Sequence, residues 1–232
     1  MTQIGTVIDR ENTYKVSPKL EAALKRRWET MSDEEAQQWI DRRTWEASIP
    51  RTFLETAFET LDPTLDPEAF QICRQYADEG EYAGKPGLLL LGPPGNGKTS
   101  LAVAILHHII EKSRGRLAVR FWNVSRGLAK VKEGFDRTRR EEANSGSILS
   151  VAQNHLVVLD DFGKQKLSEW VSEMFYCLID ELWSEERKTI ITSNIIESDL
   201  LRMDDALISR ILGMCHIVRM AGSDYRQLKP EA

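Results

Sequence analysis

The sequence predicts an α/β domain built around a parallel β-sheet, and two observations support this fold class. Five short apolar runs alternate with helical segments over residues 87–220, an order that favours parallel strands joined by right-handed helical crossovers. The first run leads into a glycine-rich turn and then a helix, which is typical of phosphate-binding loops. The 232 residues are enough for one such domain and a small appendage.

A short helical region is predicted for residues 1–48, ahead of the main domain. Apolar residues recur every three to four positions over 17–43, which is the period of an amphipathic helix. Ser32-Asp33-Glu34-Glu35 has the form of a helix start, with an N-cap serine and a capping-box glutamate. Three tryptophans form an aromatic stripe, namely Trp28, Trp39 and Trp45. The stripe is either a docking surface for a partner protein or a set of rings that pack on each other or on the main domain.

The main domain is predicted to span residues 49–232, because Pro50 disfavours helix in the residue before it. A helix over 66–81 comes first, with Pro67 in its first turn, where helices tolerate proline. Apolar periodicity then predicts strands and helices in alternation. The strands are at 87–91, 117–124, 155–161, 188–194 and 215–220, and the helices at 98–112, 125–143, 167–183 and 206–212.

The turn after the first strand fits G-x-x-x-x-G-K-[ST], the phosphate-cradling P-loop. Its glycines allow backbone N–H groups to converge on phosphate oxygens without Cβ clashes. Lys98 can reach the β- and γ-phosphates, and the Thr99 hydroxyl can join the Mg²⁺ shell. We therefore expect ATP and Mg²⁺ as cofactors. The predicted nucleotide-binding residues of the loop are Gly92, Pro93, Pro94, Gly95, Asn96, Gly97, Lys98, Thr99 and Ser100.

The third predicted strand ends in two carboxylates, Asp160 and Asp161. A P-loop site needs an acid at a strand end to hold Mg²⁺, so Asp160 is the predicted second metal-linked residue. Asp161 is placed to orient or deprotonate the attacking water. If the fourth strand lies beside the third, as in related ATPases, Asn194 at its end could bond that water or the γ-phosphate. Aspartate is shorter than the glutamate more often used for this purpose, so we expect an ATPase with slow turnover.

A net charge of −5 excludes a global basic field that would draw the whole protein to nucleic acid. The stretch 126–140 is locally cationic and is predicted to be mostly helical. It is interpreted either as a phosphate-contacting surface for single-stranded DNA or as a solvated helix of mixed charge. The predicted DNA contacts are Arg126, Lys130, Lys132, Phe135, Arg137, Arg139 and Arg140.

The three cysteines are scattered and have no C-x-x-C spacing, which excludes a zinc ribbon and fits a reducing compartment. No apolar run reaches membrane-spanning length, and the first ten residues lack the apolar core of a signal peptide. We therefore expect a cytoplasmic protein without a membrane partner.

Residues 47–227 resemble the AAA+ ATPases of the DnaC/IstB group, which comprises helicase loaders of bacteria and phages and transposition helper ATPases. The resemblance rests on Ile49-Pro50-Arg51, the segment Gly87 to Thr99, Leu159-Asp160-Asp161-Phe162-Gly163, Thr192-Ser193-Asn194, Ser209-Arg210-Ile211 and Asp224-Tyr225-Arg226. It implies a P-loop AAA+ ATPase domain with a five-stranded parallel sheet flanked by helices and no separate helical lid domain.

The same resemblance implies roles for two arginines outside the P-loop. Arg210 would be an arginine finger supplied to a neighbouring subunit, since a permanently charged fork suits phosphoryl transfer; the alternative is a surface arginine in a salt bridge. Arg226 would be a sensor-2-like contact to the nucleotide. Asn96 stands where threonine is common in the group, a difference expected to matter little.

The partners implied by the resemblance are a hexameric replicative DNA helicase held through residues 1–48, single-stranded DNA, and further copies of the chain assembled through the ATP site. Residues 1–48 contain no zinc-binding cysteines, so docking would depend on the helical region. Three functions follow as expectations. The first is an ATP-dependent helicase loader, the second an IstB-like transposition helper on duplex DNA, and the third an adaptor that binds ATP but barely hydrolyses it.

Overall fold

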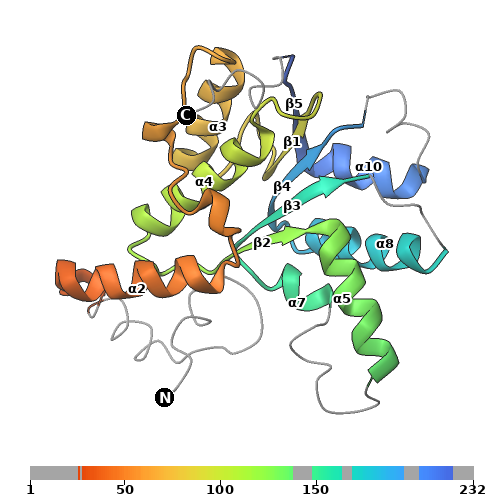
Figure 1. Cartoon of the computed structure of the whole chain (residues 1–232), viewed down its shortest axis with the longest axis horizontal. Helices are drawn as coiled ribbons and strands as arrows, with labels where there is room; N and C mark the ends of the chain where they lie inside the picture. The colour runs from red at the N-terminus through yellow and green to blue at the C-terminus, as the bar shows by residue number, and fades with distance from the viewer. Residues whose placement is uncertain (1–25, 27, 138–147, 164–168, 196–203, 222–232) are drawn as a thin grey trace.

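Five parallel strands form one sheet in the order β2-β3-β4-β1-β5 (Figure 1). In this computed structural model the described residues are 26, 28–137, 148–163, 169–195 and 204–221. The strands are β1 (Gly87–Leu91), β2 (Val119–Asn123), β3 (Leu156–Phe162), β4 (Lys188–Ser193) and β5 (Cys215–Arg219). Each lies within about two residues of its predicted range, so the predicted five-stranded parallel sheet is confirmed. β1 pairs with β4 on one side and β5 on the other, which places the P-loop strand inside the sheet.

Helices cover both faces of the sheet (Figure 1). The first group is α2 (Asp33–Glu46), α3 (Pro67–Glu79) and α4 (Lys98–Lys112), and the second is α5 (Val124–Arg137), α7 (Ile148–Ala152), α8 (Glu169–Ser184) and α10 (Asp205–Met214). Successive side chains of β1 point to opposite faces of the sheet, as they do in any strand. Leu88 and Leu90 join the α3–α4 core, and Leu89 and Leu91 join the core that includes α8 and α10.

The capping signal predicted at Ser32 is present at the start of α2, and α3 has caps of its own at both ends. Ser32 caps α2 and forms a capping box with Glu35. The Asp66 carboxylate accepts from the backbone N–H of Ala69, and Pro67 occupies the first turn of α3. Gly80 ends α3 in the left-handed conformation that favours glycine. These helix boundaries are therefore set by local sequence.

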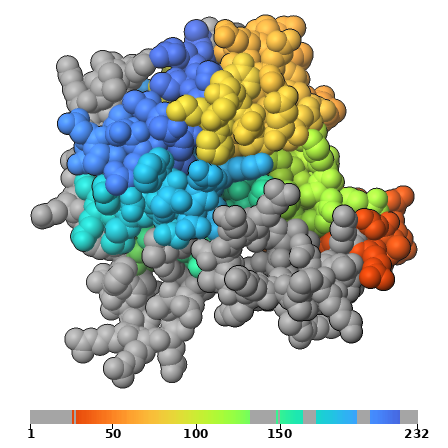
Figure 2. Space-filling view, turned by 180° about the vertical axis from the view of Figure 1, so that it is seen from behind, coloured from red at the N-terminus to blue at the C-terminus, as the bar shows by residue number. Residues whose placement is uncertain are grey.

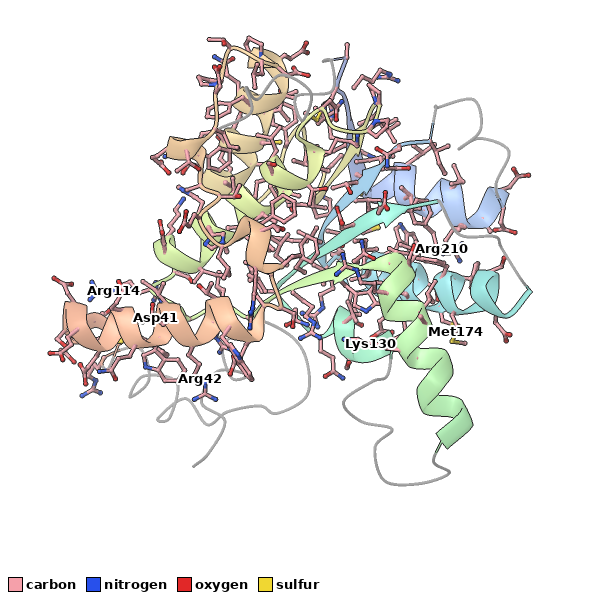
Figure 3. All side chains as sticks on the ribbon, viewed as in Figure 1. Asp41, Arg42, Arg114, Lys130, Met174 and Arg210 are labelled. Atoms are coloured by element: carbon pink, nitrogen blue, oxygen red, sulfur yellow. The ribbon has the colours of Figure 1, made fainter. Side chains whose placement is uncertain are left out.

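α2 lies against the turn between α4 and β2. Arg114 donates to the Met31 carbonyl at 3.0 Å and to Asp33 Oδ1 at 3.0 Å, and Figure 3 shows Arg114 beside the start of α2. The buried Arg43 donates to the Gly115 carbonyl at 3.0 Å. Phe121 of β2 donates from its backbone to the Ala47 carbonyl at 2.8 Å. α2 is thus fixed to the sheet-containing domain, and the predicted division at residue 48 stays a prediction.

The three tryptophans of the predicted stripe have different environments. Trp28 is buried, and its ring meets that of Trp39 edge-to-face with centroids 5.5 Å apart. Trp45 is 83% exposed at the end of α2. Two of the rings therefore pack together, and the third is available on the surface.

Two short 3-10 helices connect α2 to α3, namely η2 (Arg51–Phe53) and η3 (Phe58–Thr60). Phe58 is buried and packs edge-to-face on Phe70 of α3, with centroids 5.4 Å apart. This contact holds the connection against the α3–α4 face. Among the helices described here, none is both long and apolar enough to cross a lipid bilayer.

Candidate functional site

A cavity of about 900 Å³ opens at the carboxyl ends of the strands, where β1 passes through the P-loop into α4. Ligands of open α/β sheets bind at this edge, and the volume lies within the usual range for small-molecule sites. The sequence-predicted residues that line it are Pro94, Gly95, Asn96, Gly97, Lys98, Thr99, Ser100, Arg126, Asp160, Asp161 and Asn194. The fold thus brings together the P-loop, both aspartates and the predicted polar residue of β4.

The Lys98 ammonium is held by carbonyl groups of its own loop. Its Nζ donates to the Gly92 carbonyl at 2.8 Å, the Pro93 carbonyl at 2.6 Å and Asn96 Oδ1 at 2.8 Å. Three acceptors match the three protons of an ammonium group, so this buried charge is satisfied. All three acceptors are neutral, and phosphate oxygens can therefore compete for the lysine with a stronger charge-assisted bond.

Asn96 does more than fill a position that threonine usually occupies. Its side chain is 1% exposed. While its Oδ1 accepts from Lys98, its Nδ2 donates to the Met220 carbonyl at 2.9 Å, just after β5. Asn96 therefore ties the P-loop to the chain that follows β5, a link that the P-loop motif does not reveal.

Glycine is required at two positions of the loop for different reasons. A Cβ on Gly92 would lie 2.2 Å from the Met220 carbonyl oxygen and 2.4 Å from Asn96 Nδ2, so only glycine permits the close approach. Gly97 has a φ of +89° at the start of α4, in the left-handed region that side chains disfavour. Both glycines allow the backbone to turn tightly around the lysine.

Asp160 at the end of β3 is the centre of a hydrogen-bond network. Its Oδ1 accepts from the Thr99 hydroxyl at 2.8 Å and from the Thr192 hydroxyl at 2.9 Å. Its Oδ2 accepts from Asn123 Nδ2 at 3.1 Å. Thr99, Asn123 and Thr192 come from α4, β2 and β4, so the network joins three elements around one carboxylate. The sequence did not single out Asn123 or the side chain of Thr192.

Asp161 is turned by an irregularity in the strand pairing. The register of β3 against β4 shifts between Leu159 and Phe162, and Asp161 has a φ of +64°. Such bulges re-aim a side chain at the end of a strand. Asp161 Oδ1 accepts from Asn194 Nδ2 at 2.9 Å, and its backbone N–H donates to Thr192 Oγ1 at 3.0 Å. The two acids thus face different partners: Asp160 bonds Thr99, and Asp161 bonds Asn194.

The donor set fits a magnesium ion bound together with phosphate. Mg²⁺ prefers oxygen ligands and is usually held by one or two protein groups plus substrate phosphates and water. Thr99 Oγ1 and Asp160 Oδ1 supply two adjacent oxygens at the cavity. Within the described ranges, no three His, Cys, Asp or Glu side chains form a metal site by themselves. The phosphates of a nucleotide would therefore complete the coordination.

A second wall of the cavity was not predicted from the sequence. It comes from the connection between α2 and α3 and from the start of α3, with the apolar residues Phe53, Leu61, Leu65 and Phe70. Two threonines, Thr52 and Thr56, lie on the same wall. These side chains have no motif in common, because short turns bring them together from separate positions. The wall thus adds an apolar surface to the cavity that holds the phosphate-binding loop.

Arg210 does not line this cavity in its own chain. It lies on α10, and Figure 3 shows it between α10 and α8. Its Nε donates to Asp180 Oδ1 at 2.7 Å, and another guanidinium nitrogen donates to the Tyr176 hydroxyl at 2.8 Å. The side chain remains 24% exposed. α8 and α10 lie side by side on this face (Figure 2). The salt bridge that was the alternative for Arg210 is present, and a role for Arg210 at another chain's site stays a prediction.

The predicted DNA-contacting residues are described only in part. Arg126 and Lys130 are exposed on α5, and Figure 3 shows Lys130 on this helix. Lys132, Phe135 and Arg137 belong to α5, but their side chains lie outside the described residues. Arg139, Arg140 and the predicted sensor Arg226 also lie outside them. Of the two described residues, Arg126 lines the cavity and Lys130 does not.

The three cysteines are free thiols. Burial raises the pKa of Cys215 to about 12 and raises that of Cys73 as well. Both buried thiols therefore stay protonated at neutral pH, and neither is suited to nucleophilic chemistry.

Two curated relatives are similar to this chain over most of its length. The phage-like element PBSX protein XkdC of Bacillus subtilis is 23% identical over 210 residues, which cover 84% of this chain and 76% of that protein. The insertion sequence IS21 putative ATP-binding protein of Pseudomonas aeruginosa is 23% identical over 197 residues, which cover 82% of this chain and 70% of that protein. The chain is thus similar both to a phage-element protein and to a protein of a mobile element.

The fold is similar to that in the crystal structure of the DnaC helicase loader, with a TM-score of 0.60 at 24% identity. The match covers 75% of this chain and all of that one. The profile of the family described as IstB-like ATP binding protein matches residues 76–231, more than half of the chain. The protein therefore belongs to the IstB-like ATP-binding family, and its domain has the P-loop AAA+ fold that DnaC also has.

Proposed function

We propose that this protein is an ATPase that loads a hexameric replicative DNA helicase onto single-stranded DNA when replication begins. The observation that carries the ATPase part is the network that connects the P-loop to the strand ends through Thr99, Asp160, Thr192, Asp161 and Asn194. The loader part is supported by the likeness to the DnaC helicase loader and by the exposed Trp45 on α2.

The proposal assigns roles to five polar residues of the site, namely Lys98, Thr99, Asp160, Asp161 and Asn194. Lys98 exchanges its neutral loop acceptors for the β- and γ-phosphate oxygens of ATP. Thr99 and Asp160 would hold Mg²⁺, which when bound would neutralise charge that develops on the phosphates. Asp161 orients the attacking water and accepts its proton, while Asn194 holds the Asp161 carboxylate and the water in line. The apolar wall at Phe53 and Phe70 takes the base.

Slow turnover is part of the proposal. The Asp161 carboxylate is one methylene shorter than a glutamate, and it is already bonded to Asn194. ATP would promote assembly of several copies and a grip on single-stranded DNA, and hydrolysis would release the loader. The protein would act in the cytoplasm, where a reducing environment fits its three free cysteines.

Replacing Asp161 tests the hydrolysis step. Asp161→Ala is expected to lower kcat for ATP by about 100-fold, because a positioned general base contributes about 10²–10⁴-fold, while the affinity for ATP is kept. The control is Asp205→Ala, an exposed aspartate on α10. Steady-state phosphate release measures turnover. Equal rates for wild type and Asp161→Ala would favour the adaptor that binds ATP without hydrolysing it.

A second candidate function is a helper ATPase in transposition. The family match and the similarity to the IS21 ATP-binding protein favour it. Such a protein would assemble on duplex DNA and direct a transposase. Capture assays with the host's replicative helicase separate the two functions. Binding of the helicase supports the loader, whereas ATP-dependent filaments on duplex DNA without helicase capture support the helper.

Trp45 provides the site-specific test of helicase docking. Trp45→Ala is expected to weaken helicase capture by about tenfold or more, because exposed aromatic anchors dominate interfaces. Nucleotide affinity should not change, since Trp45 does not line the cavity. Trp183→Ala is the matched control, an exposed tryptophan on α8. Equal capture of the helicase by wild type and both variants would contradict the proposal that α2 is the docking helix.

A further inference from the structure

Arg126 is a second cationic group at the cavity. The cavity lining among the described residues contains two basic side chains, Lys98 and Arg126, together with four aspartates. From the sequence, Arg126 was grouped with the cationic helix predicted to touch DNA. Arg126 lines the same cavity as Asp160 and Asp161, which suggests a different ligand.

The two cations are held in different ways. Lys98 is buried and bonded to three loop acceptors. Arg126 is exposed, and within the part of the chain that the structure describes its guanidinium makes no hydrogen bond or ion pair. An arginine carries five donors and stays protonated at any ordinary pH. Arg126 therefore offers a planar, permanently charged donor group to whatever enters the cavity.

The backbone of Arg126 is fixed relative to the metal-linked carboxylate. Its N–H donates to Asn123 Oδ1 at 3.2 Å, and Asn123 Nδ2 donates to Asp160 Oδ2 at 3.1 Å. The next residue, Gly127, lies so close to the Trp122 ring that a Cβ there would be 2.1 Å from it. The first turn of α5 is thus held against β2, and Asn123 links the backbone of Arg126 to the Asp160 carboxylate.

We propose that Arg126 contacts the terminal phosphate of ATP bound in the same chain. This inference rests on the proposed ATP binding. Asn123 ties Arg126 to Asp160, and Asp160 bonds Thr99 at the start of α4, so Arg126 belongs to the strand-end side of the cavity. The apolar wall that suits the base is formed by other elements. An arginine fork pairs well with the oxygens of a phosphate.

The contact would give the protein a way to distinguish ATP from ADP. A group that reaches the third phosphate adds affinity for ATP and none for ADP. Arg210 does not line the cavity of its own chain. The contribution of Arg126 would therefore be present in a single chain, before any copies assemble.

The test compares Arg126→Ala with Lys130→Ala, an exposed basic residue one turn further along α5 that does not line the cavity. Wild type and both variants of the full chain are titrated with ADP and with the non-hydrolysable analogue AMPPNP in Mg²⁺. Arg126→Ala should weaken AMPPNP binding by about tenfold or more, the size expected for a hydrogen bond to a charged group, and leave ADP binding nearly unchanged. Lys130→Ala should change neither, and Arg126→Lys should recover part of the AMPPNP affinity.

Three outcomes overturn the proposal, and they are distinguishable. If Arg126→Ala keeps the wild-type ratio of AMPPNP to ADP affinity, Arg126 does not read the third phosphate. If both α5 variants leave nucleotide binding unchanged but weaken binding of a fluorescent single-stranded oligonucleotide equally, Arg126 belongs to a DNA surface. If wild type binds neither nucleotide, the proposed function fails together with this inference. Thermal unfolding of each variant checks that the fold is kept.

Discussion

The P-loop and the α8–α10 surface hold their functional cations in opposite ways. Lys98 is buried, and neutral groups within six residues of it in the sequence accept its protons. Arg210 is partly exposed and is held by Asp180 and Tyr176, which lie 30 and 34 residues away. One cation is enclosed by its own loop at the cavity, and the other lies on a surface between two helices.

The difference indicates what each cation can do within one chain. Phosphate oxygens can replace neutral carbonyls around Lys98, so the lysine is ready for a nucleotide in its own cavity. Arg210 lies outside that cavity, and its partner is a carboxylate. A nucleotide contact by Arg210 therefore requires a second copy of the chain. A site that takes this second cation from a neighbouring chain stays a prediction.

The largest expected effect comes from Arg210→Ala. A trans arginine finger is worth about 10³-fold or more in kcat, so hydrolysis should fall by that order while ATP affinity is kept. Mixing Arg210→Ala with Asp161→Ala should restore part of the turnover, because each variant supplies what the other lacks. Phosphate release over a range of mixing ratios measures this. No recovery in any mixture would mean that Arg210 does not act at the site of a second chain. Arg210 would then act within its own chain or have no role in hydrolysis.

Asp180→Asn is the matched control for Arg210. It removes the charge that pairs with the guanidinium but leaves the guanidinium in place. Because Asp180 is partly exposed, losing the ion pair should cost no more than about 1 kcal/mol. Hydrolysis should stay near the wild-type rate. If Asp180→Asn is as inactive as Arg210→Ala, the arginine acts through the packing of α8 and α10.

Lys98→Ala removes the cation of the P-loop and should cause the next largest change. Loss of the charged bonds to two phosphates is expected to raise the Kd for ATP by about 100-fold or more, since each bond is worth about 1.5–3 kcal/mol. Lys112→Ala is the control, since Lys112 lies in the last turn of the same helix and is half exposed. Fluorescent-nucleotide titration measures both. Unchanged ATP binding in Lys98→Ala would refute the P-loop assignment.

Asn96→Ala should produce a smaller functional change than Lys98→Ala. The Gly92 and Pro93 carbonyls still hold Lys98, so ATP affinity should fall by only a few-fold. Stability should fall by about 1–3 kcal/mol, because the buried Met220 carbonyl loses its donor. Asn154→Ala is the comparison variant, a partly buried asparagine that also donates to a backbone carbonyl. Loss of affinity as large as in Lys98→Ala would mean that Asn96 orients the lysine itself.

The sequence was sufficient for features that depend on neighbouring residues in the chain. Apolar periodicity placed the five strands and the helices α3, α4, α8 and α10 within about two residues, whereas α7 was not predicted. The P-loop motif placed Lys98 and Thr99 at the start of α4, because the turn and the helix start are encoded in a single stretch. The cap at Ser32 was equally readable, since a cap bonds a backbone group three residues away.

Only the tertiary structure decided which side chains meet around the carboxylates. Asp160 bonds Thr99 and Asn123, which lie 61 and 37 residues away in the chain. The apolar wall at Phe53 and Phe70, the cavity position of Arg126 and the tie from Asn96 to Met220 were also absent from the motifs. The physical reason is that apolar patterning specifies that a strand is buried, but not which strands flank it. The order β2-β3-β4-β1-β5 sets these neighbours, and it results from packing the whole sheet between its two layers of helices.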